Sequence, residues 1–283
     1  MKSTMKKSTC LVATLLLLVG SAFSAPTNVA NAAAEEVSYE GRYYDVPSVS
    51  TRAAGDVETI TFAQKDDQYI GLPNNVPYYY SNNLTNACGA VGGGIVVGYY
   101  DKYFQNLIPN YTNYYTATGK YRPQDSTYVP AMIQSMYTLM QTNVVAPGVS
   151  EQECLDGLEA YVEGKGYSIS YTAVKPYGGS FNHTAYQNAI NNGQPVILFC
   201  DSIVLVELDS GEMQDETIVM QESQDHIIVG FGYEVIKYYD VYNRNFRTDI
   251  YLKVASGWDP NKLGYIKIND ESWLDSGFAV DIY

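Results

Sequence analysis

The sequence predicts an α+β fold in which helices and strands occupy separate parts of the chain. Helical patterns fill residues 88–193, patterns typical of strands dominate from residue 195 onward, and no internal repeat interrupts this order. Alternating βαβ units would mix the two patterns, whereas separate runs of helices and strands are typical of α+β domains. About 210 residues follow residue 70, which is a common size for a single domain.

Four helices are expected. The first runs from Cys88 to about residue 104 and contains five glycines. Because each glycine costs a helix about 1 kcal/mol relative to alanine, this helix is expected to be buried, with other backbone close to it. Pro130 stands in the first turn of the second helix, whose methionine stripe is expected to fill the core. A Ser-x-x-Glu capping box at residues 150–153 opens the third helix, and the fourth covers residues 182–193.

Apolar and alternating runs then predict six strands, over residues 195–200, 203–208, 217–221, 226–236, 249–255 and 263–269. Cys200 ends the first of these strands, and Cys154 lies on the apolar face of the third helix. Both are therefore expected to be small core residues, although a disulfide between them is also compatible with the sequence.

The first 32 residues have the pattern of a secretory signal peptide. Lysines precede the apolar run 10–19, and Ala-Asn-Ala at residues 30–32 is a small-x-small cleavage site. The apolar run is too short to span a bilayer, so no membrane anchor is expected after cleavage. The sequence therefore predicts a protein that is secreted or held at the cell surface.

Composition excludes several classes of function. Hydrophobic residues make up 46% of the chain, which is enough for a core, so wholesale disorder is excluded. Acidic residues number 31 against 17 basic ones, and this negative charge repels phosphate backbones, so no nucleic-acid partner is expected. The carboxylates form no usable acid/base pair by spacing, and two histidines with scattered cysteines match no zinc pattern. No metal or other cofactor is expected.

The chemistry of the chain is concentrated at Cys88 and His226. Three cysteines remain after export, and an odd number leaves at least one thiol outside any disulfide. Cys88 follows a polar turn at the start of a helix, where the positive end of the helix dipole favours the nucleophilic thiolate. His226 opens the apolar run 226–236 and is the candidate base, whereas His183 is expected to face solvent at a helix start. The 138 residues between Cys88 and His226 fall within the roughly 130–150 typical of papain-type enzymes.

Three short motifs carry a family resemblance. They are Asn-Ala-Cys-Gly at residues 86–89, Gly-Gln-Pro-Val-Ile at 193–197, and Asp-His-Ile-Ile-Val-Gly-Phe-Gly-Tyr at 225–233. Over residues 75–270 the chain resembles papain-superfamily cysteine peptidases, most closely the secreted bacterial branch similar to double-glycine-leader (bacteriocin-processing) peptidases. The resemblance implies a papain-like fold, in which a helical part headed by the nucleophile helix packs against an antiparallel sheet or half-barrel that carries the histidine. The peptidase domain then covers residues 71–283.

The resemblance also implies the catalytic roles. Cys88 is the expected nucleophile and His226 the base, and the substrate is a protein or peptide. A side-chain amide, commonly Gln, should stand about six residues before the nucleophile and donate to the oxyanion. Asn82 and Asn83 occupy this place. Residues 33–70 are expected to be an N-terminal arm or a removable propeptide.

The chain departs from the family at the group that orients the imidazole. The family has Asn or Asp there, before a small residue and Trp, whereas this sequence has Ser256. A serine oxygen can hold the ring nitrogen but stabilises imidazolium less than a carboxylate does. Asp259 is the first substitute to test and Asp240 the second. Trp258 is expected either to shield the base or simply to pack.

Three functions therefore stand open. The first is an active cysteine peptidase, and the second is a papain-like domain with weakened catalysis that acts as an exported binding or adhesion module. A cell-wall amidase ranks below both, because the spacing of Cys and His is long for such compact enzymes. Tyrosine-rich stretches at residues 78–80, 111–115 and 238–239 either line a substrate cleft or form amphipathic surface.

Overall fold

The computed structural model describes residues 41–43, 46–47, 54–73, 75–81, 83–258, 263–268 and 273–283. They all lie in one folding unit, Tyr39–Tyr283. The predicted signal peptide lies outside the described residues, as do Asn82 and Asp259.

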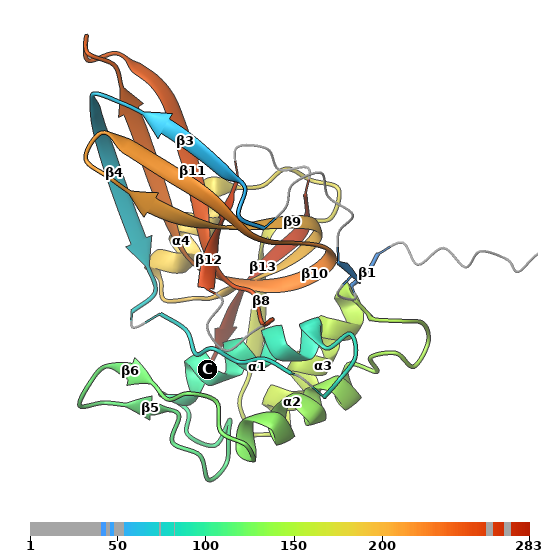
Figure 1. Ribbon diagram of the computed structural model, residues 1–283. Coiled ribbons are helices and arrows are strands. Elements are labelled where there is room, and N and C mark those ends of the chain that lie inside the picture. The colour runs from blue at the N-terminus through green and yellow to red at the C-terminus, as the bar shows by residue number, and fades with distance from the viewer. Residues whose placement is uncertain are drawn as a thin grey trace, which may run out of the picture. The chain divides into compact units, whose positions relative to one another are not determined.

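The fold class is α+β, as the sequence predicts, but the helices do not all precede the strands, because residues 57–71 form two strands before the first helix and residues 169–175 form a strand between the third and the fourth. Figure 1 shows α1, α2 and α3 gathered below the sheet. The helices are α1 (Cys88–Asp101), α2 (Tyr128–Leu139), α3 (Glu151–Glu163) and α4 (His183–Asn191). The strands are β1 (Arg42–Tyr43), β2 (Val46–Pro47), β3 (Val57–Thr61), β4 (Gln64–Gly71), β5 (Tyr114–Tyr115), β6 (Lys120–Tyr121), β7 (Val149–Ser150), β8 (Ile169–Lys175), β9 (Val196–Ser210), β10 (Gln214–Tyr239), β11 (Asn245–Ala255), β12 (Leu263–Lys267) and β13 (Leu274–Ile282).

Local capping groups set where the helices begin. The predicted capping box of α3 is present, with Ser150 and Glu153 each accepting a hydrogen bond from the other's backbone N–H. The side chain of Asn182 caps α4 in the same sense. Helix α2 begins two residues before Pro130, because the Asp125 carboxylate accepts three backbone N–H bonds and so fixes the first turn earlier.

The prediction of separate strands at 195–200 and 203–208, and at 217–221 and 226–236, was wrong. Each pair is one continuous strand, β9 and β10 respectively, and the two pair along the hairpin from Ser210 opposite Asp215 to Leu198 opposite Ile228. Most of the polar residues between the predicted pieces, such as Ser202 and Gln224, are paired in the ladder, so they do not form turns; Asp201 and Asp225 stand outside the ladder, where the backbone is locally distorted. A long hairpin can have polar residues on its solvent-facing side when its other face is covered by the core.

In the described part of the chain, nine strands form one sheet. Strand β10 pairs with β9 and β11, β11 with β12, and β12 returns to β9 where Tyr265 stands opposite Val206, so this part of the sheet closes on itself. Strands β3 and β4, from the segment expected to be an arm, pair with β10 over most of their length. Residues 57–71 are therefore integral to the sheet.

Helix α1 is buried along its whole length, and its glycines account for how closely its neighbours approach. Gly92 faces Ile227 and Val229 of β10, and Gly93 faces the methionines of α2. Side chains of the sheet and of α2 thus pack directly onto the helix backbone. The expectation of a buried helix is confirmed, and the close neighbours are mainly side chains.

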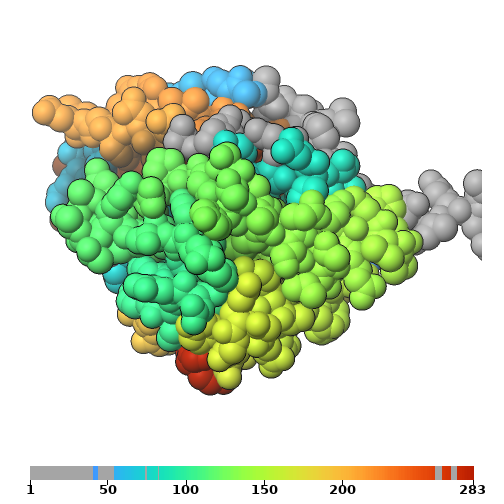
Figure 2. Space-filling model, turned by 90° about the horizontal axis from the view of Figure 1, so that it is seen from below, coloured from blue at the N-terminus to red at the C-terminus, as the bar shows by residue number. Residues whose placement is uncertain are grey.

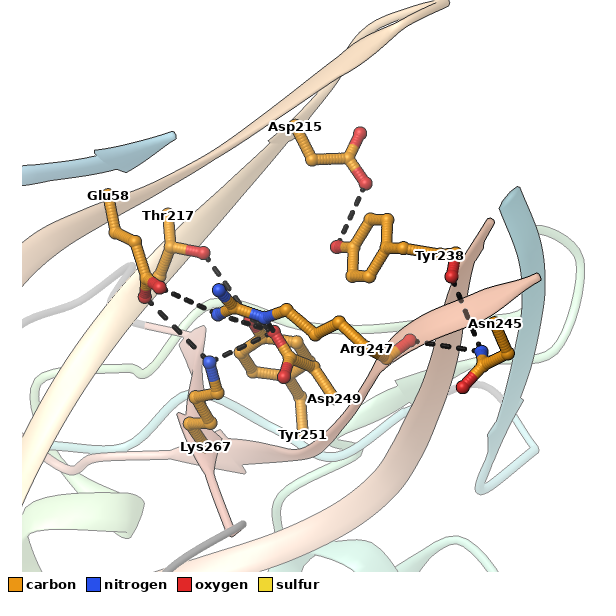
Figure 3. Close-up of polar contacts among 9 residues, drawn as sticks. All are labelled: Glu58, Asp215, Thr217, Tyr238, Asn245, Arg247, Asp249, Tyr251 and Lys267. Atoms are coloured by element: carbon orange, nitrogen blue, oxygen red, sulfur yellow. Dashed lines mark hydrogen bonds and ion pairs between the residues drawn. The ribbon is translucent and has the colours of Figure 1, made fainter. Parts of the chain in front are cut away.

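A second, smaller apolar cluster is formed mainly by side chains of β3, β9, β10 and β11, and a network of charged side chains borders it (Figure 3). The buried carboxylate of Asp249 lies 2.8 Å from Arg247 and 2.9 Å from Lys267, and Arg247 also reaches Glu58. Burial alone would raise the pKa of Asp249, but the hydrogen bonds and charges of its two cations outweigh burial and lower it. The network ties β3 to β11 and β12.

Candidate active site

Cys88 is the first residue of α1, as its sequence context predicts, and only 4% of it is exposed. The N-cap residue is Ala87, whose methyl group cannot accept a hydrogen bond from the first turn. The first intrahelical bond runs from the N–H of Val91 to Ala87. The first-turn N–H groups and the positive end of the helix dipole therefore surround Cys88, an environment that favours a thiolate.

The turn before Cys88 is fixed by a side chain from a distant loop. Asn86 has a φ of 57° and donates from its amide to Asn143, at 2.8 Å. Asn143 donates in turn to the carbonyl of Thr85, at 3.1 Å, and Tyr137 donates to the same carbonyl, at 3.0 Å. These hydrogen bonds fix the direction in which the chain enters α1. Sequence reasoning missed Asn143, and only its residue type, common in left-handed loops, could have drawn attention to it.

His226 lies well inside β10, not at the mouth of a strand as predicted, and 1% of it is exposed. Asp225, just before it, has a φ of 47°, so the strand backbone is distorted at this point. The His226 Nε2 lies 2.7 Å from the carbonyl oxygen of Ser256. The Trp258 ring stacks on the imidazole, with centroids 4.4 Å apart and planes 24° apart, so it covers one face of the base.

Three elements meet around these two residues. A Cβ placed on Gly89, which follows the candidate nucleophile, would lie 3.4 Å from Ile227, which follows the candidate base. A Cβ on Gly257 would lie 2.8 Å from Val91. The first turn of α1, the centre of β10 and the segment 256–258 are therefore packed together, although they are distant in sequence.

The other two cysteines are core thiols, as expected, and are not bonded to each other. Burial, followed by the charge of Glu151, raises the pKa of Cys154 to about 12. Burial also raises the pKa of Cys200 well above its ordinary value, with smaller contributions from Asp275 and Cys88. Cys200 is the cross-strand partner of His226. At neutral pH neither core thiol is a nucleophile.

Ser256 stands where the sequence places it, but its backbone oxygen, not its hydroxyl, contacts the imidazole. The hydroxyl accepts instead from the N–H of Trp258, at 3.4 Å. A carbonyl only accepts, so His226 Nε2 carries a proton in this contact, and Nδ1 is the nitrogen that can take one up. Asp240 is ruled out as a substitute, because it closes the turn after β10 through three hydrogen bonds from Tyr242 and Arg244. Asp259 lies outside the described residues.

One of the two predicted oxyanion donors is described. Asn83 is exposed and lines a pocket of about 390 Å³, together with Leu84, Gln124 and the start of α2. The pocket therefore borders the segment that leads to Cys88. Asn82 lies outside the described residues.

Three acidic residues are adjacent in sequence to members of the cross-strand row Leu274, Cys200 and His226; they are Asp275, Asp201 and Asp225. Burial, with the charges of Asp201 and Asp275, raises the pKa of Asp225 to about 6. His183 begins α4 and packs edge-on against Phe181, at 4.9 Å between centroids.

Comparisons of the chain with protein-family models, with curated proteins and with solved structures found no match. Within the described residues, no cluster of three or more His, Cys, Asp or Glu side chains is suited to hold a metal ion. No helix in that part of the chain has both the length and the apolar character needed to cross a membrane.

Proposed function

We propose that the protein is a secreted cysteine peptidase with a papain-like arrangement, in which Cys88 and His226 hydrolyse peptide bonds of a protein or peptide substrate. One observation carries the proposal. A cysteine begins a buried helix whose first turn packs against the part of β10 that carries a histidine; the Nε2 of this histidine lies 2.7 Å from a carbonyl oxygen, and a tryptophan covers one face of its ring.

The proton moves first. Because Nε2 donates to the Ser256 carbonyl, Nδ1 of His226 takes the proton of the Cys88 thiol. The product is a thiolate and an imidazolium, and each charge stabilises the other. The helix dipole supports the thiolate, whereas the stacked Trp258 ring supports the imidazolium.

The thiolate sulfur then attacks the carbonyl carbon of the peptide bond. The backbone N–H of Cys88 and the side-chain amide of Asn83, or of Asn82, hold the oxyanion, and each donor is worth about 3–4 kcal/mol in acyl-transfer enzymes. The imidazolium returns its proton to the departing amine as the C–N bond breaks. Water hydrolyses the thioester and restores the thiol.

A second candidate function is a papain-like binding module with weakened catalysis. Two observations favour it. Cys88 and His226 are 4% and 1% exposed, so a substrate has little direct access to them, and a neutral carbonyl replaces the amide or carboxylate that orients the ring in the family. The two candidates differ in whether the thiol is activated.

Thiol alkylation distinguishes them. The folded protein is treated with iodoacetamide between pH 5 and 9, and each cysteine is quantified by mass spectrometry. We expect selective labelling of Cys88 with an apparent pKa below the usual 8.5, because Cys154 and Cys200 are buried with raised pKa values. His226→Ala should slow the labelling at least tenfold at pH 6. A peptide-library digestion then reports cleavage.

Ser256→Ala is the matched control, since it removes the hydroxyl but keeps the carbonyl that contacts the ring. Its labelling rate should equal that of the wild type. Equal reaction of all three cysteines, or a Cys88 that reacts only after denaturation, would refute the proposal. A Cys88 without a lowered pKa, together with no cleavage of any peptide, would favour the binding module.

A further inference from the structure

A second pocket, of about 600 Å³, lies at the opposite end of α1. Asp101, the last residue of the helix, lines it, and Cys88 is the first. At 1.5 Å per residue the two are about 20 Å apart along the helix axis, so the pocket is separate from the candidate active site. Its remaining walls come from residues 102–116, which include the tyrosine-rich stretch 111–115. Figure 2 shows the segment from the end of α1 to α3, in green and yellow-green, spread over this face.

Neutral hydrogen-bonding groups dominate the walls. Gln105 and Asn106 contribute amides, Thr112 and Thr116 contribute hydroxyls, and all four residues are exposed. Each amide offers both donors and an acceptor, and each hydroxyl can donate or accept. Tyr114 adds a ring whose apolar face is edged by a polar group. Such walls suit a ligand that presents several hydroxyl groups and an apolar ring face.

The charge of the pocket argues against an anionic ligand. Among the described residues that line it, Lys102 is the only cation, and tyrosine rings already surround its ammonium group. The Nζ lies 4.1 Å from the centroid of Tyr99 and 4.7 Å from that of Tyr103, with Tyr114 and Tyr121 within 6 Å. Because the rings hold this cation and Asp101 stands beside it, the pocket has no concentration of positive charge for a phosphate or carboxylate.

Buried polar side chains make the walls rigid. Asp101 and Asn113 are 2% and 1% exposed, and both line the pocket. Asp101 accepts the N–H of Ile108 at 2.7 Å, and the Asn113 amide donates to the carbonyl of Gly98. The loop is thereby fixed to the helix at Ile108 and at Asn113. A pocket held in this way loses little conformational entropy on binding.

We propose that this pocket binds a neutral saccharide of one or two sugar rings. Its volume lies within the range of small-molecule sites, and its exposed amides and hydroxyls match vicinal hydroxyl groups. The ring of Tyr114 supplies the apolar contact for the C–H face of a pyranose. The inference does not depend on the proposed peptidase function, because it uses no residue of that site.

Ligand-observed saturation-transfer NMR and calorimetric titration test the proposal. The full chain is titrated at pH 7 with maltose, cellobiose and N,N′-diacetylchitobiose as probes, and with glucose 6-phosphate for comparison. We expect at least one neutral probe to bind. The double variant Gln105→Ala/Asn106→Ala should weaken its binding by about tenfold or more, since each neutral hydrogen bond is worth about fivefold.

Two further variants control the test. Thr116→Trp fills the pocket from an exposed position and should abolish binding, whereas Asn188→Ala removes an exposed amide from α4 and should change nothing. Circular dichroism confirms that each variant is folded. The proposal is overturned if none of the three neutral probes binds, if the double variant keeps wild-type affinity, or if glucose 6-phosphate binds more tightly than the neutral sugars.

Discussion

Because its neighbours pack closely against α1, we predict that replacing glycine by alanine will have opposite effects on protein stability at two positions of this helix. Gly92 and Gly98 both lie on α1, and both have ordinary helical backbone. In an unconstrained helix, alanine in place of either would stabilise the protein by about 1 kcal/mol. The surroundings of the two glycines decide whether this gain is realised.

At Gly98 an added Cβ would lie 2.5 Å from Cε2 of Tyr79 and 2.8 Å from Cγ of Pro77. Both neighbours are buried and neither ring can bend away, so the helix must shift. Overpacking of this kind costs about 1–3 kcal/mol, and we expect Gly98→Ala to destabilise the protein by up to about 2 kcal/mol after the helical gain.

At Gly92 the added Cβ would meet Ile227 at 3.4 Å and Val229 at 3.8 Å, which is ordinary van der Waals contact. Gly92→Ala should therefore stabilise the protein by up to about 1 kcal/mol. Urea unfolding followed by circular dichroism, with a common m value, measures both variants against the wild type. If both substitutions shift the free energy of unfolding in the same direction, the packing of α1 described above is wrong.

Three other substitutions test polar contacts. Tyr43→Phe removes the 3.0 Å hydrogen bond from the buried ring to Asp275 and should lower the free energy of unfolding by about 1–2 kcal/mol; an unchanged urea midpoint would contradict this. Because the pKa of Asp249 is lowered, its ionised form contributes stability at pH values above the ordinary pKa of 3.8, and this contribution is lost as the pH falls. Asp249→Asn should therefore lower the thermal midpoint at pH 7 and have little effect near pH 2. Equal effects at the two pH values would count against the network. Burial raises the pKa of Asp101 to about 7, so its contribution to stability is full below the ordinary value of 3.8 and is lost as the pH rises from about 4 to about 7. Asp101→Asn should therefore gain on the order of 2 kcal/mol over the wild type at pH 8 and little at pH 4, and the reverse order of these gains would refute the assignment.

Much of the helical part could be predicted because its signals are local. The capping box before α3 and Asn182 before α4 act within one turn of backbone, and the structure contains both. Strand limits were less accessible. Polar residues inside β9 and β10 resemble turns in the sequence, and only their pairing with the neighbouring strand shows that the hairpin continues past them, with a local distortion at Asp225.

The candidate site divides in the same way. Residue type and helix position singled out Cys88, and the scarcity of histidines singled out His226, so the pair was a sequence-based prediction. The partner of the His226 ring nitrogen could not be predicted from the sequence, because the contact uses the backbone oxygen of Ser256, and every residue type has such an oxygen. The role of Asn143 could not be predicted for a related reason, since its hydrogen bonds join segments that are more than fifty residues apart in the sequence.

The sequence by itself determined the α+β class, the existence of the four helices, the starts of α1, α3 and α4 and the two side chains that the proposed chemistry uses, since these depend on periodicity, capping and functional groups. Only the tertiary structure decided that the first turn of α1 lies against the centre of β10, and that a carbonyl from segment 256–258 holds the imidazole. Close packing across elements distant in the chain depends on the joint shape of many side chains, and no local pattern encodes it.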